Sequence, residues 1–329
     1  MTTDYDAIAL SYPNELLYMV YVDTYTYFQL IGDVREKTVL DIGCGRGEAS
    51  QRLKLMGAKH VVGVDAFPKM IQLAQQEEAR TPLGVEYRVL DVMTPQKIGE
   101  FDLVVAFSVI SIAPTREALF NTFQTVAMNL KPGGRFVTVG LNPEQPPETY
   151  KLMDKYGIRL VNPPPVKEGD LLQAIAVVDG QEIFFEDYYF TRATYNEGLA
   201  AAGFSQVIWH EPQISPEGIA QFGHSFWQDF IDSRVSIYLE CVNTGFGQKS
   251  SDTQNAVSDV YCSCAMSSPR RRLDPHGTWA HEAADVHRTG LATRSWGATD
   301  QTSTRVDGQD EVCHVGGNAC SRLPPVTQT

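Results

Sequence analysis

Up to about residue 245 the chain alternates short apolar runs, rich in β-branched residues, with segments of helical periodicity. This alternation constrains the fold more than any other feature. The runs predict strands at residues 38–42, 60–65, 85–90, 101–107 and 134–140. The helices expected between them cover residues 48–56, 68–79 and 116–130. Nearly continuous apolar strands joined by helices predict an α/β fold, with a mostly parallel sheet covered on both faces.

The pattern changes after residue 140. Two alternating apolar runs, 171–178 and 182–190, flank an Asp179-Gly180 pair, which predicts a β-hairpin. The sequence then predicts further elements in the order helix, strand, helix, strand, at residues 191–202, 205–210, 215–230 and 235–242. The hairpin is therefore expected as an insertion into the main α/β domain.

The last 84 residues, 246–329, have a different composition. They contain no Ile, one Phe, three Leu and seven Val, too few large apolar side chains for a core. We expect this segment to be a disordered C-terminal extension. The expected organisation is an N-terminal helical lid at 1–34, a main domain at 35–245 and the extension at 246–329.

Charge and composition exclude several classes of function. The formal net charge is −13, which argues against a nucleic-acid or membrane-surface partner, because binding phosphates requires a positive surface. No apolar stretch is long enough to span a bilayer, and the acidic N-terminus is unlike a signal peptide. Six scattered cysteines are too few for a disulfide scaffold. We expect a cytoplasmic protein.

The segment Val39-Leu40-Asp41-Ile42-Gly43-Cys44-Gly45-Arg46-Gly47 lies where the first strand turns into a helix. Glycines at alternate positions let a ligand approach the backbone closely. The spacing differs from the G-x-G-x-x-G of dinucleotide-binding folds, and no Gly-Lys-Ser/Thr follows. The carboxylate of Asp41 would repel a pyrophosphate and attract an ammonium or sulfonium group. The pattern therefore favours a ligand with a cationic amino-acid part.

With these motifs the sequence resembles the class I S-adenosylmethionine-dependent methyltransferases. Asp41–Gly47 matches the family motif D-x-G-x-G-x-G, and the Leu130-Lys131-Pro132-Gly133-Gly134 turn matches the L-K-P-G-G that precedes the fifth strand. The resemblance is strong over residues 35–140. It implies a Rossmann-like sheet of seven strands, the last antiparallel, with S-adenosylmethionine as cofactor.

The resemblance also implies roles for single residues. Asp65, at the end of the second strand, matches the acidic residue that binds the two ribose hydroxyls, and Asp91 matches the one that faces the adenine amino group. Because ligands bind outside the carboxyl ends of parallel strands, we expect these residues to converge on one crevice. The predicted cofactor-binding residues are Asp41, Gly43, Cys44, Gly45, Gly47, Asp65, Ala66, Met70, Asp91, Val92, Phe107 and Ser108.

The N-terminal segment is rich in tyrosine, with six of the chain's fourteen before residue 28. It resembles a narrower group, the small-molecule methyltransferases similar to the toxoflavin-biosynthesis enzyme of secondary metabolism. These aromatic residues are expected either to pack on the sheet or to form a lid over the ligand. The lid and substrate residues predicted on this basis are Tyr5, Tyr12, Tyr21 and Tyr25. Two other aromatic clusters, in 184–189 and 222–227, are expected in the core or around a substrate pocket.

Methyl transfer requires a base only when the acceptor must lose a proton. His224 is the candidate base, ahead of His210, while His60 begins a strand and is expected to be structural. The Cys and His residues of the tail match no zinc-site spacing, so no metal is expected. Asn162-Pro163-Pro164 is not at the end of the fourth strand, unlike the N-P-P motif of nitrogen methyltransferases, and is interpreted as a loop.

The leading hypothesis is an S-adenosylmethionine-dependent enzyme that methylates N, O or C of a small molecule in secondary metabolism. A second hypothesis is a protein that binds the cofactor without transferring the methyl group, as a regulator or partner subunit. An NAD-dependent oxidoreductase is disfavoured by the glycine spacing and by Asp41. The sequence identifies neither the acceptor nor the oligomeric state.

The composition of the tail leads to a testable prediction. Truncation after Gly247 should leave the melting temperature and methyl transfer nearly unchanged, because the predicted core is complete by residue 242. Limited proteolysis of the full chain should cut first beyond Gln248. A truncated protein that fails to fold, or a stable fragment that retains residues 250–329, would show that the tail is an integrated domain.

Overall fold

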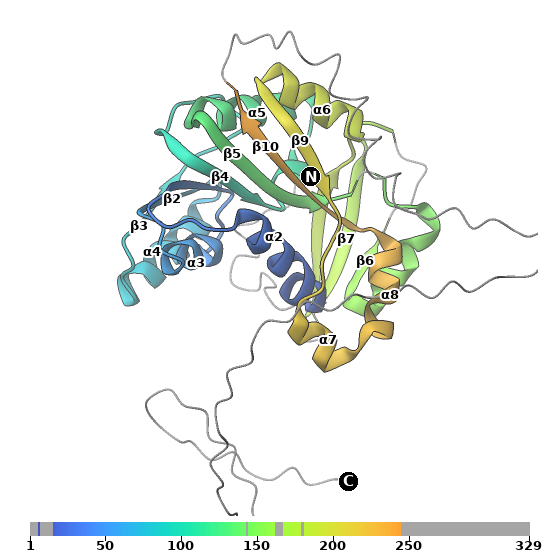
Figure 1. Cartoon of the computed structure of the whole chain (residues 1–329). Coiled ribbons are helices and arrows are strands. Elements are labelled where there is room, and N and C mark those ends of the chain that lie inside the picture. The colour runs from blue at the N-terminus through green and yellow to red at the C-terminus, as the bar shows by residue number, and fades with distance from the viewer. Residues whose placement is uncertain (1–5, 7–15, 143, 162–166, 179–180, 245–329) are drawn as a thin grey trace, which may run out of the picture. The chain divides into compact units, whose positions relative to one another are not determined.

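The computed structural model describes residues 6, 16–142, 144–161, 167–178 and 181–244 (Figure 1). Contacts between Cα atoms divide the chain into two units, Met1–Ala256 and Val257–Thr329. The second unit lies wholly outside the described residues. The predicted boundary at 245 and the prediction of a disordered tail therefore stay predictions.

A seven-stranded sheet forms the centre of the first unit, in the order β3-β2-β1-β4-β5-β10-β9 (Figure 1). Its strands are β1 (Thr38–Ile42), β2 (His60–Asp65), β3 (Val85–Val89), β4 (Phe101–Phe107), β5 (Leu130–Leu141), β9 (Phe204–His210) and β10 (Ser236–Asn243). Strands β3, β2, β1, β4 and β5 pair in parallel, and β10 is antiparallel to both its neighbours. The predicted Rossmann-like fold with an antiparallel last strand is confirmed.

Helices cover both faces of this sheet because the strand residues alternate between two apolar clusters. Val39 and Val105 face the cluster that includes residues of α2 (Thr24–Ile31), α3 (Glu48–Leu55) and α4 (Pro68–Arg80). Leu40 and Val104 face the opposite cluster, with α5 (Arg116–Asn129) and α6 (Arg192–Ala201). The carboxyl ends of the parallel strands are left between these two layers.

The predicted hairpin is part of a larger element. Strands β7 (Leu171–Val178) and β8 (Gln181–Tyr188) pair as expected, but a third strand, β6 (Ile158–Leu160), adds to β7. A 3-10 helix, η3 (Pro147–Tyr156), leads into β6. The predicted hairpin is confirmed, and the sequence missed only β6, because three residues carry too little periodicity to be recognised as a strand.

The predicted helix at 215–230 is also corrected. It is two helices, α7 (Pro216–Phe222) and α8 (His224–Ser233), separated by Gly223 at φ 78°. A glycine in this conformation ends one helix and allows the chain to turn before the next. The break lets Phe222, Phe226 and Trp227 pack in a cluster with Tyr156 of η3. These aromatic side chains are therefore core.

The N-terminal helical segment is joined to the sheet by buried polar contacts. It begins with a π-helical turn, η1 (Met19–Asp23), that continues directly into α2. Tyr238 Oη of β10 donates to Asp23 Oδ1 at 2.6 Å, and Ser236 Oγ donates to Asp23 Oδ2 at 3.2 Å. Arg135 of β5 donates to the carbonyls of Leu30 and Ile31 near the end of α2. One face of the segment is thus fixed against β5 and β10.

No helix among the described residues is both long enough and apolar enough to cross a membrane.

Asp23 should make stability depend on pH. Burial raises the pKa of Asp23 to about 6, against the hydrogen bonds from Tyr238 and Ser236, whereas an unfolded aspartate titrates near 4. The folded chain therefore holds an extra proton between these values. The contribution of Asp23 to the free energy of unfolding is fully present below pH 4. It falls by about 3 kcal/mol as the pH rises through 6. Asp23→Asn removes the charge and keeps an acceptor for Tyr238, so it should stabilise the protein at pH 7.

Urea unfolding followed by tryptophan fluorescence at pH 4.5 and pH 7 measures this effect. We expect a gain of about 1–2 kcal/mol at pH 7 and a much smaller one at pH 4.5, since the charge that Asn removes is then absent. An equal gain in the free energy of unfolding of Asp23→Asn at both pH values would contradict the raised pKa of Asp23.

Candidate cofactor-binding site

A cavity of about 300 Å³ opens at the carboxyl ends of β1, β2, β3 and β4. This is the position that the resemblance to the methyltransferases predicts for the cofactor. Its floor is the loop from β1 to α3, and its walls come from the loops after β2, β3 and β4 and from η1 and α2. The volume is within the range of small-molecule sites. The fold thus brings together residues that are up to 93 positions apart in the sequence, from Met19 to Ile112.

The loop after β1 has the backbone shape that its glycines predict. Gly43 has φ 63°, and a Cβ there would lie 2.2 Å from Val109 Cγ2, so no larger residue fits. Gly45 has φ 55°, and a Cβ there would meet nothing within 4 Å. Across the cavity Ser108 has φ 54°, an uncommon conformation for a residue with a side chain. Strained backbone of this kind concentrates at functional sites.

Asp41 lies at the end of β1 and is almost completely buried, with 1% of its surface exposed. Its Oδ2 accepts a 2.5 Å hydrogen bond from Ser50 Oγ of α3. Burial raises the pKa of Asp41 to about 7, opposed by the Ser50 bond and assisted by the nearby charges of Asp65 and Glu48. A cation entering the cavity would stabilise the ionised form of this carboxylate.

Asp65 ends β2 and holds the loops on either side of the cavity. Its Oδ2 accepts from the Gly45 amide and its Oδ1 accepts from the Phe67 amide, both at 2.9 Å. Burial raises its pKa, and these two bonds oppose the shift. Each carboxylate oxygen has a second lone pair, so Asp65 can still accept hydrogen bonds from a ligand. A pair of vicinal hydroxyls fits such an acceptor.

Asp91 follows β3 and is exposed at the far end of the cavity. Its Oδ1 accepts from the Met93 amide at 2.9 Å, which fixes the turn after the strand. The surfaces around it are mainly apolar, with Phe67, Met70 and Leu90 among the lining residues. A flat apolar group with a polar edge, such as a purine base, fits this part of the cavity.

The structure gathers the predicted cofactor residues in this one cavity, with one exception. The residues that line it are Asp41, Gly43, Cys44, Gly45, Asp65, Ala66, Met70, Asp91, Val92, Phe107 and Ser108. The exception is Gly47, which precedes α3 at φ 91° and faces Tyr87, whose Oη would lie 2.3 Å from a Cβ. Gly47 therefore serves the packing of the loop. Burial holds the pKa of the Cys44 thiol well above its usual range, so it is not a nucleophile.

The structure does not place the described lid tyrosines on the cavity. Tyr21 donates to Gln221 Oε1 of α7 at 2.7 Å and packs on Phe222 and Trp227. Tyr25 is half-buried and does not line the cavity. Tyr5 and Tyr12 lie outside the described residues. Asp6, however, accepts a hydrogen bond from the Lys69 amide at the start of α4, beside the cavity-lining Met70.

The candidate base is also not among the residues that line the cavity. His224 is exposed at the first position of α8, and His210 Nε2 lies 3.1 Å from Glu240 Oε1 between β9 and β10. Neither residue lines the cavity, so the hypothesis that His224 is the base gains no support from this arrangement. Among the described residues no group of three or more His, Cys, Asp and Glu could hold a metal ion. The tail cysteines lie outside that range.

Sequence reasoning expected the N-terminal helix over the ligand but chose its tyrosines instead of the face that lines the cavity, and it missed the contribution of α3. The additional lining residues are Met19, Thr24, Phe28, Arg46, Glu48, Ala49, Arg52, Phe67, Leu90, Met93, Val109 and Ile112. One signal was available, since Thr24 and Phe28 are four residues apart and so share a helix face. Whether the face with Thr24 and Phe28 or the face with the tyrosines lines the cavity depends on tertiary packing, which the sequence does not show.

Residues 39–134 match the family model described as a methyltransferase domain. A ubiquinone biosynthesis O-methyltransferase of Xanthomonas oryzae pv. oryzae is 30% identical over 112 residues, 33% of this chain and 45% of that protein. A ribosomal protein L11 methyltransferase of Burkholderia multivorans is 33% identical over 120 residues, 36% of this chain and 37% of that protein. The chain thus spans less than half the length of these relatives.

Solved structures with a similar course of the chain include two described as S-adenosylmethionine-dependent methyltransferases. An S-adenosylmethionine-dependent methyltransferase from Listeria monocytogenes is 19% identical, with a TM-score of 0.49 over 68% of this chain and 96% of that one. One from Mesorhizobium loti is 18% identical, with a TM-score of 0.49 over 69% of this chain and 97% of that one.

The buried carboxylate of Asp41 predicts pH-dependent binding of a ligand that carries an ammonium group. Below pH 7 the free protein holds a proton on Asp41, and binding must release it. Affinity for S-adenosylmethionine should therefore fall about tenfold for each pH unit below 7 and level off above it. Calorimetric titrations from pH 5.5 to 7.5, in buffers of different ionisation enthalpy, measure both the affinity and the proton released.

Asp41→Asn is the matched control for this titration. The variant should bind more weakly at pH 7.5, release no proton from this position and lose most of the pH dependence. A wild-type affinity that is constant from pH 5.5 to 7.5 would show that Asp41 does not face the cationic group.

Proposed function

We propose that this chain, which carries a class I S-adenosylmethionine-dependent methyltransferase domain, transfers the methyl group of that cofactor to a small-molecule acceptor. The observation that carries the proposal is the row of three carboxylates, Asp91, Asp65 and Asp41, at the ends of neighbouring strands around one cavity. The row is ordered as the cofactor's base, ribose and amino-acid parts require.

In this proposal each carboxylate has one role toward the cofactor. Asp91 faces the exocyclic amino group of the adenine, Asp65 accepts from the ribose hydroxyls, and Asp41 stabilises the ammonium group. Gly43 and Gly45 keep the loop beneath the amino-acid part free of side chains. The cofactor supplies an electrophilic methyl group on a positively charged sulfur. The chain's part is to hold this group in line with the acceptor, which gives the rate advantage of orientation.

Part of the cavity lining is apolar and suits an apolar or aromatic acceptor. This part includes Met19 and Phe28 of the N-terminal helix and Val109 and Ile112 of the segment after β4. Among the described residues the cavity lining contains no His, Lys or Tyr that could take up a proton. This favours an acceptor that is already nucleophilic at neutral pH, whether nitrogen, oxygen or an activated carbon.

The chain's acidity supports a small molecule rather than a nucleic acid as acceptor, because its net charge is −13. The ubiquinone relative is named for a small-molecule pathway and the ribosomal relative for a protein substrate, so the names of the relatives do not decide the class. We place the acceptor in secondary metabolism, following the N-terminal resemblance. A cytoplasmic location agrees with the free thiols Cys44 and Cys241.

A second candidate function is binding of the cofactor without methyl transfer, as a regulator or partner subunit. The observation in its favour is that the described lining residues include no His, Lys or Tyr, while the carboxylates Asp41, Asp65 and Asp91 are assigned to the cofactor in this proposal and Glu48 pairs with Arg46. The two functions differ in turnover and not in cofactor affinity.

Asp65 provides the test of cofactor binding. Asp65→Ala should weaken S-adenosylmethionine binding by about 1.5–3 kcal/mol, the range for hydrogen bonds to a charged group. Calorimetry measures the loss, and a thermal melt shows whether the fold survives removal of the bonds to Gly45 and Phe67. Unchanged affinity in a folded Asp65→Ala protein would contradict the proposed site.

Turnover separates the two candidate functions. Extracts that contain candidate acceptors are incubated with the enzyme and with cofactor labelled in the methyl group. Mass spectrometry then detects products that have gained the label. A labelled product that is absent with Asp65→Ala supports transfer. Tight cofactor binding without any labelled product from a broad set of acceptors supports the regulator.

A further inference from the structure

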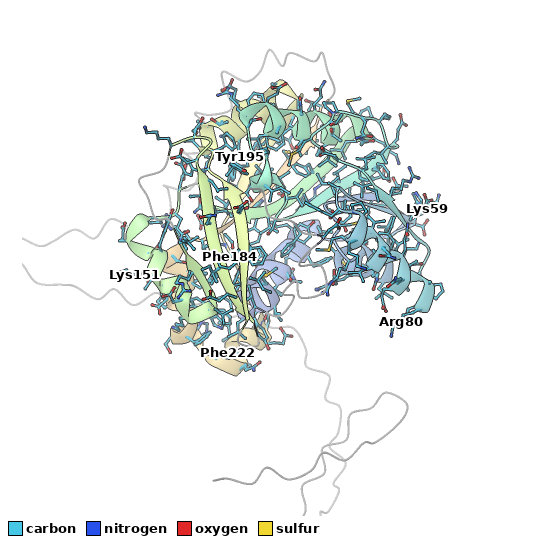
Figure 2. All side chains as sticks on the ribbon, turned by 180° about the vertical axis from the view of Figure 1, so that it is seen from behind. Lys59, Arg80, Lys151, Phe184, Tyr195 and Phe222 are labelled. Carbon is cyan, nitrogen blue, oxygen red and sulfur yellow. The ribbon has the colours of Figure 1, made fainter. Side chains whose placement is uncertain are left out.

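A side-chain hydrogen bond joins the three-stranded sheet to the turn that follows β4. Ser111 Oγ of η2 (Ile110–Ile112) donates to Asp187 Oδ1 of β8 at 2.6 Å. Asp187 lies three positions beyond Phe184, which marks β8 in Figure 2. The two bonded residues are 76 positions apart in the sequence, and neither has a role in the function proposed so far.

The turn that carries Ser111 divides its residues between two sides. A 3-10 helix has three residues per turn, so Val109 and Ile112 lie one above the other, and both line the cavity. Ser111 lies on another side of the turn, is 3% exposed and does not line the cavity. Its hydroxyl group therefore holds the back of a wall whose front is formed by Val109 and Ile112.

The turn has only long hydrogen bonds of its own. The Ile112 amide donates to the Val109 carbonyl at 3.3 Å. The Ala113 amide donates to the Ile110 carbonyl at 3.5 Å, and both distances exceed the usual range for such bonds. The bond to β8 is much shorter and ends on a carboxylate, and hydrogen bonds to charged groups are about twice as strong as neutral ones. The position of the turn therefore depends strongly on β8.

The carboxylate of Asp187 in turn depends on Ser111. Burial raises the pKa of Asp187, and the bond from Ser111 opposes the shift. Tyr195 of α6, labelled in Figure 2, lies nearby, since burial and then the charge of Asp187 raise its pKa. Within the described part of the chain no Lys, Arg or His forms an ion pair with Asp187. The Ser111 hydroxyl therefore stabilises a charge that no cation there neutralises.

We propose that Asp187 is a positioning residue, which through Ser111 holds the Val109–Ile112 wall against which the methyl acceptor binds. The inference rests on the proposed function, because that function assigns the apolar part of the lining to the acceptor. The row of carboxylates assigned to the cofactor is not involved, so acceptor binding and cofactor binding should respond differently to loss of this bond. Asp187 thereby affects which acceptors fit, although it does not itself line the cavity.

Amide hydrogen exchange measures how firmly the wall is held, without any acceptor. In Asp187→Ala and in Ser111→Ala the amides of Ile112 and Ala113 should exchange about tenfold or more faster than in the wild type, the factor expected when a hydrogen bond to a charged group is lost. The double variant should exchange no faster than either single variant, because both substitutions remove the same bond. Asp187→Asn keeps an oxygen that accepts from Ser111 and should limit the increase to about threefold.

A fluorescent probe measures the consequence for the acceptor part of the cavity. N-phenyl-1-naphthylamine, a neutral aromatic compound, is titrated into protein saturated with S-adenosylhomocysteine, the cofactor after loss of its methyl group. Asp187→Ala and Ser111→Ala should weaken probe binding by about three- to tenfold, and Asp187→Asn should restore most of it. The affinity for S-adenosylmethionine, measured by calorimetry, should stay within about threefold of the wild-type value. A general loss of stability would not produce this division.

The matched control is Glu182→Ala, on the same strand as Asp187. Glu182 is exposed and forms an ion pair with Arg159 at 2.9 Å. It lies five positions from Asp187, so its side chain is on the opposite face of the strand. This variant should keep wild-type exchange in the turn and wild-type probe affinity. Thermal melts of all variants show whether the fold is intact, and Ser111→Ala carries the test if Asp187→Ala does not fold.

The outcomes separate this inference from the function on which it rests. Unchanged exchange at Ile112 and Ala113 in folded Asp187→Ala and Ser111→Ala proteins would show that the bond does not hold the wall. A loss of probe affinity in Asp187→Ala alone would assign Asp187 a direct contact with the ligand and also overturn the inference. Wild-type protein that binds the cofactor and not the probe would overturn it as well. Wild-type protein that binds no S-adenosylmethionine contradicts the proposed function itself.

Discussion

Two buried carboxylates at the ends of neighbouring strands, Asp41 and Asp65, are the feature on which the rest of the site depends. Taking a carboxylate out of water is costly unless it is neutralised or fully hydrogen-bonded. Asp65 meets part of this cost by accepting the amides of Gly45 and Phe67, and Asp41 by accepting from Ser50. The same bonds shape the glycine loop. The cost that remains, visible as raised pKa values, disfavours an anionic ligand and favours a cationic one.

The part of the site that could be predicted from the sequence is the part that local chemistry determines. Strands β1, β2 and β4 begin and end where their apolar runs do. Because parallel strands all end at one edge, a residue known to end a strand is also known to lie at that edge. The resemblance singles out Asp41, Asp65 and Asp91, and this argument predicts that they lie together. Gly43 could be recognised because only glycine avoids the contact with Val109.

The remaining lining residues depend on contacts between distant segments. The tyrosines of the N-terminal helix suggested a lid, yet Tyr21 packs against α7 and α8, while Thr24 and Phe28 face the cavity. Which face of a helix points inward follows from what packs on the other face. Here that is an aromatic cluster supplied by η3 and α8, more than 120 positions further along the chain. Gly223 within the expected helix was the available signal that His224 would start a new helix at the surface.

The N-terminal helix therefore connects the two halves of the architecture. Its inner face is held by two hydrogen bonds, one from Tyr238 to Asp23 and one from Arg135 to the carbonyl of Leu30. Both bonds join the helix to strands β10 and β5 of the sheet. Its outer face supplies Met19 and Phe28 to the cavity lining, and the Phe28 ring packs on the Arg52 guanidinium of α3. Packing in the core thus determines one wall of the cavity. Because that wall joins the N-terminal helix to α3 through the Phe28 ring, a substitution at Phe28 changes the contribution of both helices to the cavity lining.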